Sequence, residues 1–199
     1  MLACSGMAFE VNYTDARFEG LESGGLELAG ASFVGCEFVN CDFSEISMRG
    51  AHFAECRFER CELAMVGFAD AVFQGVEFES CRLTGVNFSL LQQGAIGVMA
   101  QFKGCDLSFC SFRKMDLKMC SFKECVAREA EFVQCELEGV SFDGSDLERC
   151  VFHNNGLIKA DFRTARNYMI SAHSNRIRDI KVALPEALSL LVAIDVDLQ

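Results

Sequence analysis

Large hydrophobic residues recur every five positions along most of this chain, and we call each such position a centre. Between residues 31 and 63, the centres are Phe33, Phe38, Phe43, Met48, Phe53, Phe58 and Leu63. A small or aliphatic residue lies two positions before each centre, and the residue between the two is mostly polar. A period of five fits neither the helical period of 3.6 nor the strand period of 2. The stretch therefore predicts a structural repeat.

Each five-residue unit predicts one short extended side followed by one corner. Residues two apart in an extended segment point to the same side, so the centre and the residue two before it face inward together. Ten of the sixteen glycines fall two positions after a centre. A corner needs a permissive backbone, and glycine provides one.

The spacing of identical residues predicts four sides in each coil. Phe18, Phe38, Phe58 and Phe78 are separated by twenty residues, which is four units of five. The other columns with this spacing are Phe33, Phe53, Phe73; Phe102, Phe122, Phe142, Phe162; Phe112, Phe132, Phe152; and Leu117, Leu137, Leu157. The predicted fold class is an all-β solenoid, a quadrilateral β-helix over residues 1–165.

The register breaks once, near residues 89–101. Leu91, Ile96 and Val98 keep the character of inward residues, but the next centre, Phe102, comes one residue early. Two interpretations remain open. The favoured one is a bulge or shortened corner inside a continuous coil, and the other is a small projecting loop.

The pattern ends after residue 165, and residues 166–199 form a predicted capping or dimerisation segment. Pro185 suits the first position of a helix, and Glu186 suits its first turn. An open solenoid end must be capped or paired, so we expect this segment to join two copies, with a monomeric cap as the alternative. The predicted dimerisation residues are Leu184, Pro185, Leu188 and Leu191 of the helix and Ile194, Val196 and Leu198 of an edge strand.

The twelve cysteines are predicted to be free thiols. Eleven of them lie two positions before a centre, where they would act as small buried side chains. Stacked side chains point in parallel, which disfavours the torsion of a disulfide. Their spacings of five and twenty lack the converging C-x2-C arrangement of a metal site. We expect no metal and no cofactor.

The chain carries no catalytic fingerprint and no targeting pattern. It has no Gly-rich phosphate loop, no G-x-S-x-G and no HExxH, so we expect no enzymatic activity. The first residues lack the charged and apolar regions of a signal peptide. No stretch approaches the ~20 apolar residues of a membrane span. We expect a cytoplasmic protein without membrane contact.

These units resemble the pentapeptide-repeat family, whose motif is roughly A/C-(D/N)-L/F-x-G. The resemblance covers about residues 11–165 and implies a right-handed, four-sided β-helix. Residues 167–170 (NYMI), Asn175 and residues 183–191 (ALPEALSLL) are similar to the Qnr and albicidin-resistance branch. That branch implies binding to DNA gyrase or topoisomerase IV, two-fold dimers joined through their C-terminal ends, and mimicry of a DNA duplex.

Charge adds support for mimicry. The net charge is −11, and residues 1–90 hold fourteen acids against five bases. The predicted gyrase-binding acids are Glu19, Glu37, Glu59, Glu77 and Glu79 on one face and Asp42, Glu45 and Glu62 on the next. Arg17, Arg57 and Arg60 interrupt the first face. An acidic rod repels nucleic acid and is steered toward basic channels.

Two functional hypotheses follow. The first is a DNA mimic that protects gyrase from a quinolone or a toxin, without direct contact with nucleic acid. The alternative is a pentapeptide-repeat scaffold for other protein–protein interactions.

Overall fold

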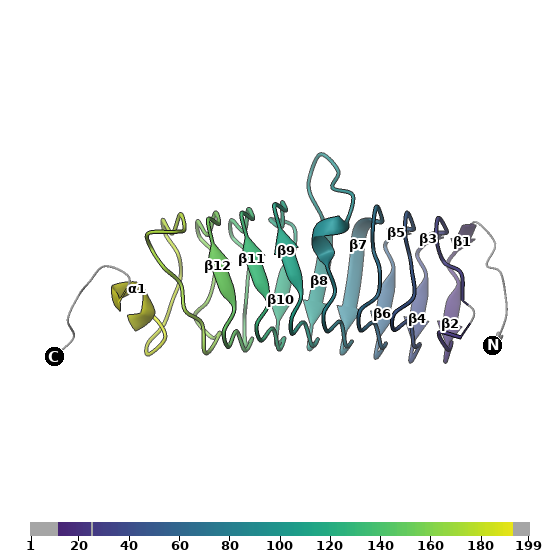
Figure 1. Cartoon of the computed structure of the whole chain (residues 1–199), viewed down its shortest axis with the longest axis horizontal. Helices are drawn as coiled ribbons and strands as arrows, with labels where there is room; N and C mark the ends of the chain where they lie inside the picture. Colours follow the sequence, from purple (N-terminus) through teal and green to yellow (C-terminus); the bar gives the residue numbers. More distant parts are fainter. Residues whose placement is uncertain (1–11, 25, 193–199) are drawn as a thin grey trace.

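The computed structural model describes residues 12–24 and 26–192, which form an elongated parallel β-solenoid of about seven turns (Figure 1). β1 and α1 lie at opposite ends of the rod. The predicted solenoid is confirmed.

Most strands span only three residues, because each is one side of a coil. The strands are β1 (Asn12–Thr14), β2 (Arg17–Glu19), β3 (Ser32–Val34), β4 (Glu37–Val39), β5 (His52–Ala54), β6 (Arg57–Glu59), β7 (Val72–Glu79), β8 (Met99–Lys103), β9 (Ser111–Arg113), β10 (Ser121–Lys123), β11 (Glu131–Val133) and β12 (Val151–His153). The helical segments are a 3-10 turn, η1 (Phe88–Leu90), and a short helix, α1 (Leu188–Val192).

The pairing between coils confirms four sides. Phe33 lies opposite Phe53, and Phe38 lies opposite Phe58, each twenty residues apart in parallel register. We name the sides by their centres. Face A holds 13, 33, 53, 73, 98, 117, 137 and 157; face B holds 18, 38, 58, 78, 102, 122, 142 and 162; face C holds 43, 63, 83, 107, 127 and 147; face D holds 28, 48, 68, 88, 112, 132 and 152.

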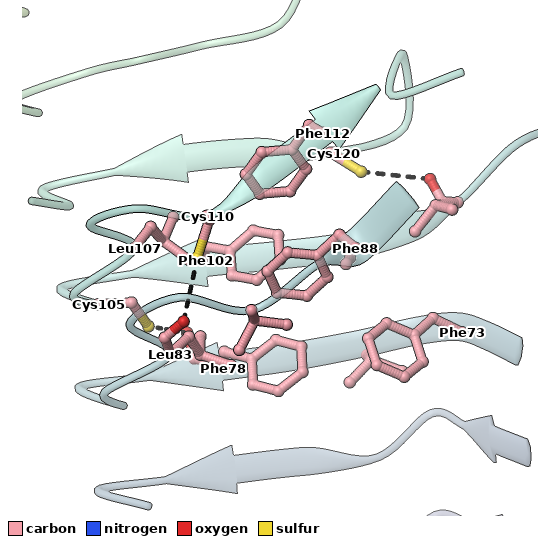
Figure 2. Close-up of a cluster of buried hydrophobic side chains, with 14 of the residues drawn as sticks. Phe73, Phe78, Leu83, Phe88, Phe102, Cys105, Leu107, Cys110, Phe112 and Cys120 are labelled. Carbon is pink, nitrogen blue, oxygen red and sulfur yellow. Dashed lines mark hydrogen bonds between the residues drawn. The ribbon is translucent and has the colours of Figure 1, made fainter. Parts of the chain in front are cut away.

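The core is a set of stacked aromatic columns. The rings of Phe102 and Phe122 stack at 5.2 Å between centroids, with planes 5° apart. Phe112 of face D meets Phe122 of face B edge to face at 5.6 Å. Figure 2 shows the columns around Phe88 and Phe102, where the rings fill the interior. Aromatic pairs prefer these offset and edge-to-face arrangements.

The corners differ from expectation in composition. Nine of the glycines that follow a centre by two have positive φ, but so do eighteen non-glycine residues, with φ between 49° and 61°. Most of these also follow a centre by two, and sixteen of the eighteen are polar or charged. Glycine is therefore one solution to the corner, and polar side chains with solvent access are the other.

The inward residue before each centre has a second role that the sequence did not reveal. Cys81 Sγ donates to the Phe58 carbonyl at 3.3 Å and accepts the Cys61 N–H at 3.4 Å. Cys105, Cys110 and Cys120 donate to carbonyls of earlier coils in the same way (Figure 2). The eleven described cysteines are buried and free. They therefore satisfy corner backbone groups as well as filling space.

The register break is a projecting loop followed by a shortened corner, so both interpretations hold in part: β7 and β8 pair with a register irregularity between Gln74 and Val76. Val98 on face A comes ten positions after Phe88 on face D, and Phe102 on face B follows four positions later. The loop rises above η1 (Figure 1). Leu91 and Val98 are buried as expected, but Ile96 is 62% exposed. Gln93 anchors the loop by hydrogen bonds with the Lys114 carbonyl and the Asp116 amide.

The stacked coils continue beyond residue 165. Parallel bridges join Gly156 to Arg176 and Asp161 to Lys181. Pro185 lies in a turn, and α1 begins three residues later than expected, at Leu188. Leu184 and Leu188 are exposed. Leu191 lies in α1, and Ile194, Val196 and Leu198 fall outside the described residues.

Across residues 12–24 and 26–192, no helix is long and apolar enough to cross a membrane.

Candidate protein-interaction surface

The eight predicted acids lie on two adjacent faces. Glu37 and Glu77 occupy one column of face B, where Arg17 and Arg57 alternate with them in register. Glu19, Glu59 and Glu79 lie on the same face, on the other side of the centres. On face C, a parallel backbone bridge joins Asp42 to Glu62 of the next coil, and Glu45 occupies the corner after Phe43. The structure therefore places the acids side by side as the register required.

Face B is a ladder of ion pairs and not a uniform acidic surface. Arg17 pairs with Glu37 at 2.7 Å and with Glu19 at 3.6 Å. Arg57 bridges Glu59 and Glu79, and Arg60 also pairs with Glu59. These bases pair with carboxylates of their own coil and of neighbouring coils, so the potential of this face is weaker than its count of acids implies.

Two further pairs complete this pattern. Lys103 pairs with Glu79 at 3.0 Å, and Arg82 pairs with Glu62 at 2.5 Å on face C. The hydrogen bond and charge of Lys103 lower the pKa of Glu79.

Three of the eight acids have no ion pair within the described part of the chain: Asp42, Glu45 and Glu77. Asp42 accepts a hydrogen bond from the Ser44 amide at 2.9 Å and is partly buried. Glu45 is exposed at its corner. Within the described residues, no ion pair offsets the charge of these three carboxylates.

The charge excess is larger on face C than on face B. From residue 41 to residue 149, the units of face C carry seven acids and three bases, whereas the units of face B from 16 to 164 carry eight acids and six bases. Five of the eight predicted acids lie on face B, where Arg17, Arg57 and Arg60 interrupt them. Face C is the more acidic surface.

Asp146 on face C was not among the residues predicted from the amino-acid sequence. Its side chain is only 2% exposed, and it accepts hydrogen bonds from Arg128 Nη2 at 2.8 Å and Asn167 Nδ2 at 2.8 Å. Burial alone would raise the pKa of Asp146, but the hydrogen bonds from Asn167 and Arg128 lower it overall. The neighbouring Arg128, Arg166 and Asn167 were the only signals in the sequence. Asp146 joins three coils and is a structural anchor.

Comparison with known proteins decides the family. A model described as "Pentapeptide repeat region" matches residues 31–94, and a second, "Pentapeptide repeats (8 copies)", matches residues 100–139 and 130–166. The chain belongs to the pentapeptide-repeat family. No curated protein sequence matches this pentapeptide-repeat protein.

Solved structures share its fold. A trypsin-treated form of QnrB1, a plasmid-mediated fluoroquinolone resistance protein, aligns with a TM-score of 0.61 at 17% identity, covering 94% of this chain and 100% of that one. A second trypsin-treated form aligns with a TM-score of 0.62 at 20% identity, covering 94% and 90%. At these identities the likeness establishes the fold alone. This pentapeptide-repeat protein is Qnr-like in architecture.

A groove lies beneath the projecting loop. It has a volume of about 450 Å³ and is lined by Glu55, Gln74, Gln92, Ile96 and Met99, among others. A single carboxylate and two amides provide no acid–base pair and no nucleophile with an activating base. In the described residues, no group of three His, Cys, Asp or Glu side chains is arranged to hold a metal ion.

Proposed function

We propose that this pentapeptide-repeat protein binds DNA gyrase as a mimic of duplex DNA and protects it from fluoroquinolones, without catalysing a reaction. The observation that best supports this proposal is the structural match with QnrB1, a fluoroquinolone resistance protein, over 94% of this chain. The same binding would protect gyrase from a toxin that targets it. Topoisomerase IV is a second candidate partner. The protein then acts in the cytoplasm, where gyrase is found.

The dimensions of the rod support this proposal. Face B stacks eight centres, from Phe18 to Phe162. Seven steps of ~4.8 Å give a length of roughly 34 Å. Duplex DNA carries one charge per ~1.7 Å, or about twenty over that length. The net charge of −11 is about half of that value.

The acidic surface that faces gyrase in this proposal is face C with the adjoining part of face B. Asp42, Glu45 and Glu77 lie there without ion pairs, and Glu62 and the other predicted acids surround them. A basic DNA-binding saddle attracts such a surface over a distance of about 8–10 Å at physiological salt. Nucleic acid itself is repelled, so no direct contact with DNA is part of the proposal.

We also propose that two copies join through their C-terminal segments. Leu184, Leu188 and Met169 expose apolar surface at the end of the rod, and the open edge of a solenoid requires a cap. A two-fold dimer doubles the length of the rod and matches a two-fold symmetric target.

A scaffold for other protein–protein interactions is the second candidate. The observation that favours it is the pairing of Glu19, Glu37, Glu59, Glu62 and Glu79 with basic side chains. A mixed-charge ladder of this kind also suits partners that are not strongly basic.

Direct binding to purified gyrase at low and high salt tests the proposal. We expect binding at low salt that weakens as salt rises, because charge-driven association is screened. The control is an acidic protein of similar net charge without pentapeptide repeats, which should not compete for gyrase. Absence of gyrase binding at low salt would leave the scaffold hypothesis in its place.

A further inference from the structure

Two large apolar side chains lie exposed on the corner between faces C and D. Met65 is 62% exposed and Phe109 is 58% exposed. Both have positive φ, 56° and 61°. Of the eighteen non-glycine residues with positive φ in the described chain, these two alone are apolar.

The two side chains belong to one patch. The Met65 amide donates to the Thr84 carbonyl, and the next amide of the column, that of Gly85, donates to the Ser108 carbonyl. Met65 and Phe109 are therefore two coils apart, about 10 Å at ~4.8 Å per coil, with Gly85 between them. A Cβ on Gly85 would overlap Met65 Sδ, so the methionine lies over the glycine. We call Met65, Gly85 and Phe109 the corner patch.

Uncharged residues flank the corner patch on its face C and face D sides, whereas Glu45 and Glu129 continue its corner column in the coils before and after it. Ala64, Thr84 and Ser108 lie on its face C side. Gly67, Asn87 and Ser111 lie on its face D side. Interface cores are depleted in charge and enriched in aromatic residues and methionine. The composition of the corner patch and its surroundings matches that description.

Acidic residues outnumber basic ones at the border of this area, where Arg82 lies between Glu62 and Asp106 on face C and pairs with Glu62. Glu45 precedes Met65 in the same corner column, and its amide donates to the Ala64 carbonyl. Asp106 lies on face C beside the patch, where its carboxylate accepts hydrogen bonds from the Ser108 amide and Thr84 Oγ1. The complementary partner surface is an apolar socket with lysine and arginine side chains around it.

We infer that the corner patch is the apolar anchor by which this protein docks on a basic protein surface, and that gyrase presents that surface. This inference rests on the proposed function. A large apolar side chain in the left-handed region carries backbone strain, and exposure to water gives it no compensating burial. Docking would bury both side chains, while the acids of face C provide long-range attraction.

The test is gyrase affinity of Phe109→Asn and Met65→Asn, with Met119→Asn as the matched control. Met119 is 50% exposed on a different corner, between faces A and B. Asparagine tolerates positive φ, so the first two variants should keep the wild-type Tm or raise it. We expect each to bind gyrase at least about tenfold more weakly, as hot-spot residues do, and Met119→Asn to bind like wild type.

The salt dependence separates the patch from the acids. The ratio of wild-type to Phe109→Asn affinity should stay constant as salt rises, because apolar contact is not screened. If both patch variants bind within twofold of wild type, the inference is wrong even though the proposed function survives. If the wild-type protein does not bind gyrase, the proposed function and gyrase as the occupant fail together.

Discussion

Phe112 and Phe132 stack face to face in the middle of the solenoid, with ring centroids 4.8 Å apart and planes 1° apart. Each ring also meets Phe122 edge to face, at 5.6 and 5.4 Å. Every ring thus contacts its own column and the column across the core. A centre in this region is held by neighbours from three coils.

Phe132→Ala should destabilise the protein strongly. Phe132 is fully buried, and removing a buried phenylalanine costs about 3–5 kcal/mol. Guanidinium unfolding followed by circular dichroism measures the change. Phe109→Ala is the matched control, because that ring is exposed, and its effect should stay within about 0.5 kcal/mol. Equal losses for the two variants would contradict the assignment of Phe132 to the core.

Cys81→Ser should be better tolerated than Cys81→Val. Ser145 occupies the same column of face C, where its Oγ donates to the Phe122 carbonyl at 3.0 Å and accepts the Cys125 amide at 2.9 Å. A serine at position 81 can make the same two hydrogen bonds. Valine leaves the Cys61 amide without its acceptor, which costs about 1–3 kcal/mol for a buried group.

Thermal unfolding of the two Cys81 variants checks this prediction. The serine variant should unfold at the higher temperature. A higher Tm for the valine variant would mean that the cysteines matter only for their volume and apolar character.

Asp146→Asn should remove a pH-dependent part of the stability. The pKa of Asp146 is lower in the folded protein than its ordinary value. Its contribution is therefore present above the unfolded pKa of about 4 and is lost as the pH falls through the lower folded value. At pH 7 the variant should lose about 1–3 kcal/mol, the cost of disrupting a buried charged hydrogen-bond network.

The measurement is Tm against pH for wild type and Asp146→Asn. The difference should be largest near neutral pH and shrink below pH ~4. A difference that is constant from neutral to acidic pH would assign the loss to packing and not to the ionised carboxylate.

Reversal of unpaired acids should weaken gyrase binding more than reversal of acids on face D. One double variant carries Glu45→Lys and Glu77→Lys. The other carries Asp70→Lys and Glu131→Lys. Both double variants change the net charge equally. Asp70 and Glu131 pair with Arg49 and Arg113 and belong to a face without charge excess.

Binding to gyrase at low salt distinguishes these two double variants. The first should bind several-fold more weakly, since a favourable charge near a basic channel becomes a repulsive one. If the face D variant loses as much affinity, net charge alone governs binding and no particular face is presented to gyrase.

The regular part of the fold was predictable because one periodic constraint acts on every unit. The repeat of five fixes which side chains face inward, and the twenty-residue spacing of Phe38, Phe58 and Phe78 fixes the number of sides. The loop between Phe88 and Val98 was not predictable to the same degree. A break in register shows how many residues are inserted between two centres. The same number of inserted residues can form either a bulge or a projecting loop.

The surface was less predictable than the core because charge depends on neighbours in other coils. The pairs Arg17–Glu37 and Lys103–Glu79 join residues twenty or more positions apart. A count of acids along the sequence does not show which of them a stacked base neutralises. The buried Asp146 was hidden for the same reason, since its partners come from the coils on either side.

The most direct test is a gyrase supercoiling assay with a fluoroquinolone present, in which this protein is titrated. We predict that supercoiling activity lost to the drug returns as the protein is added, and that Phe109→Asn restores it less efficiently than wild type. If supercoiling stays inhibited at every concentration of wild-type protein that binds gyrase, protection from fluoroquinolones is contradicted.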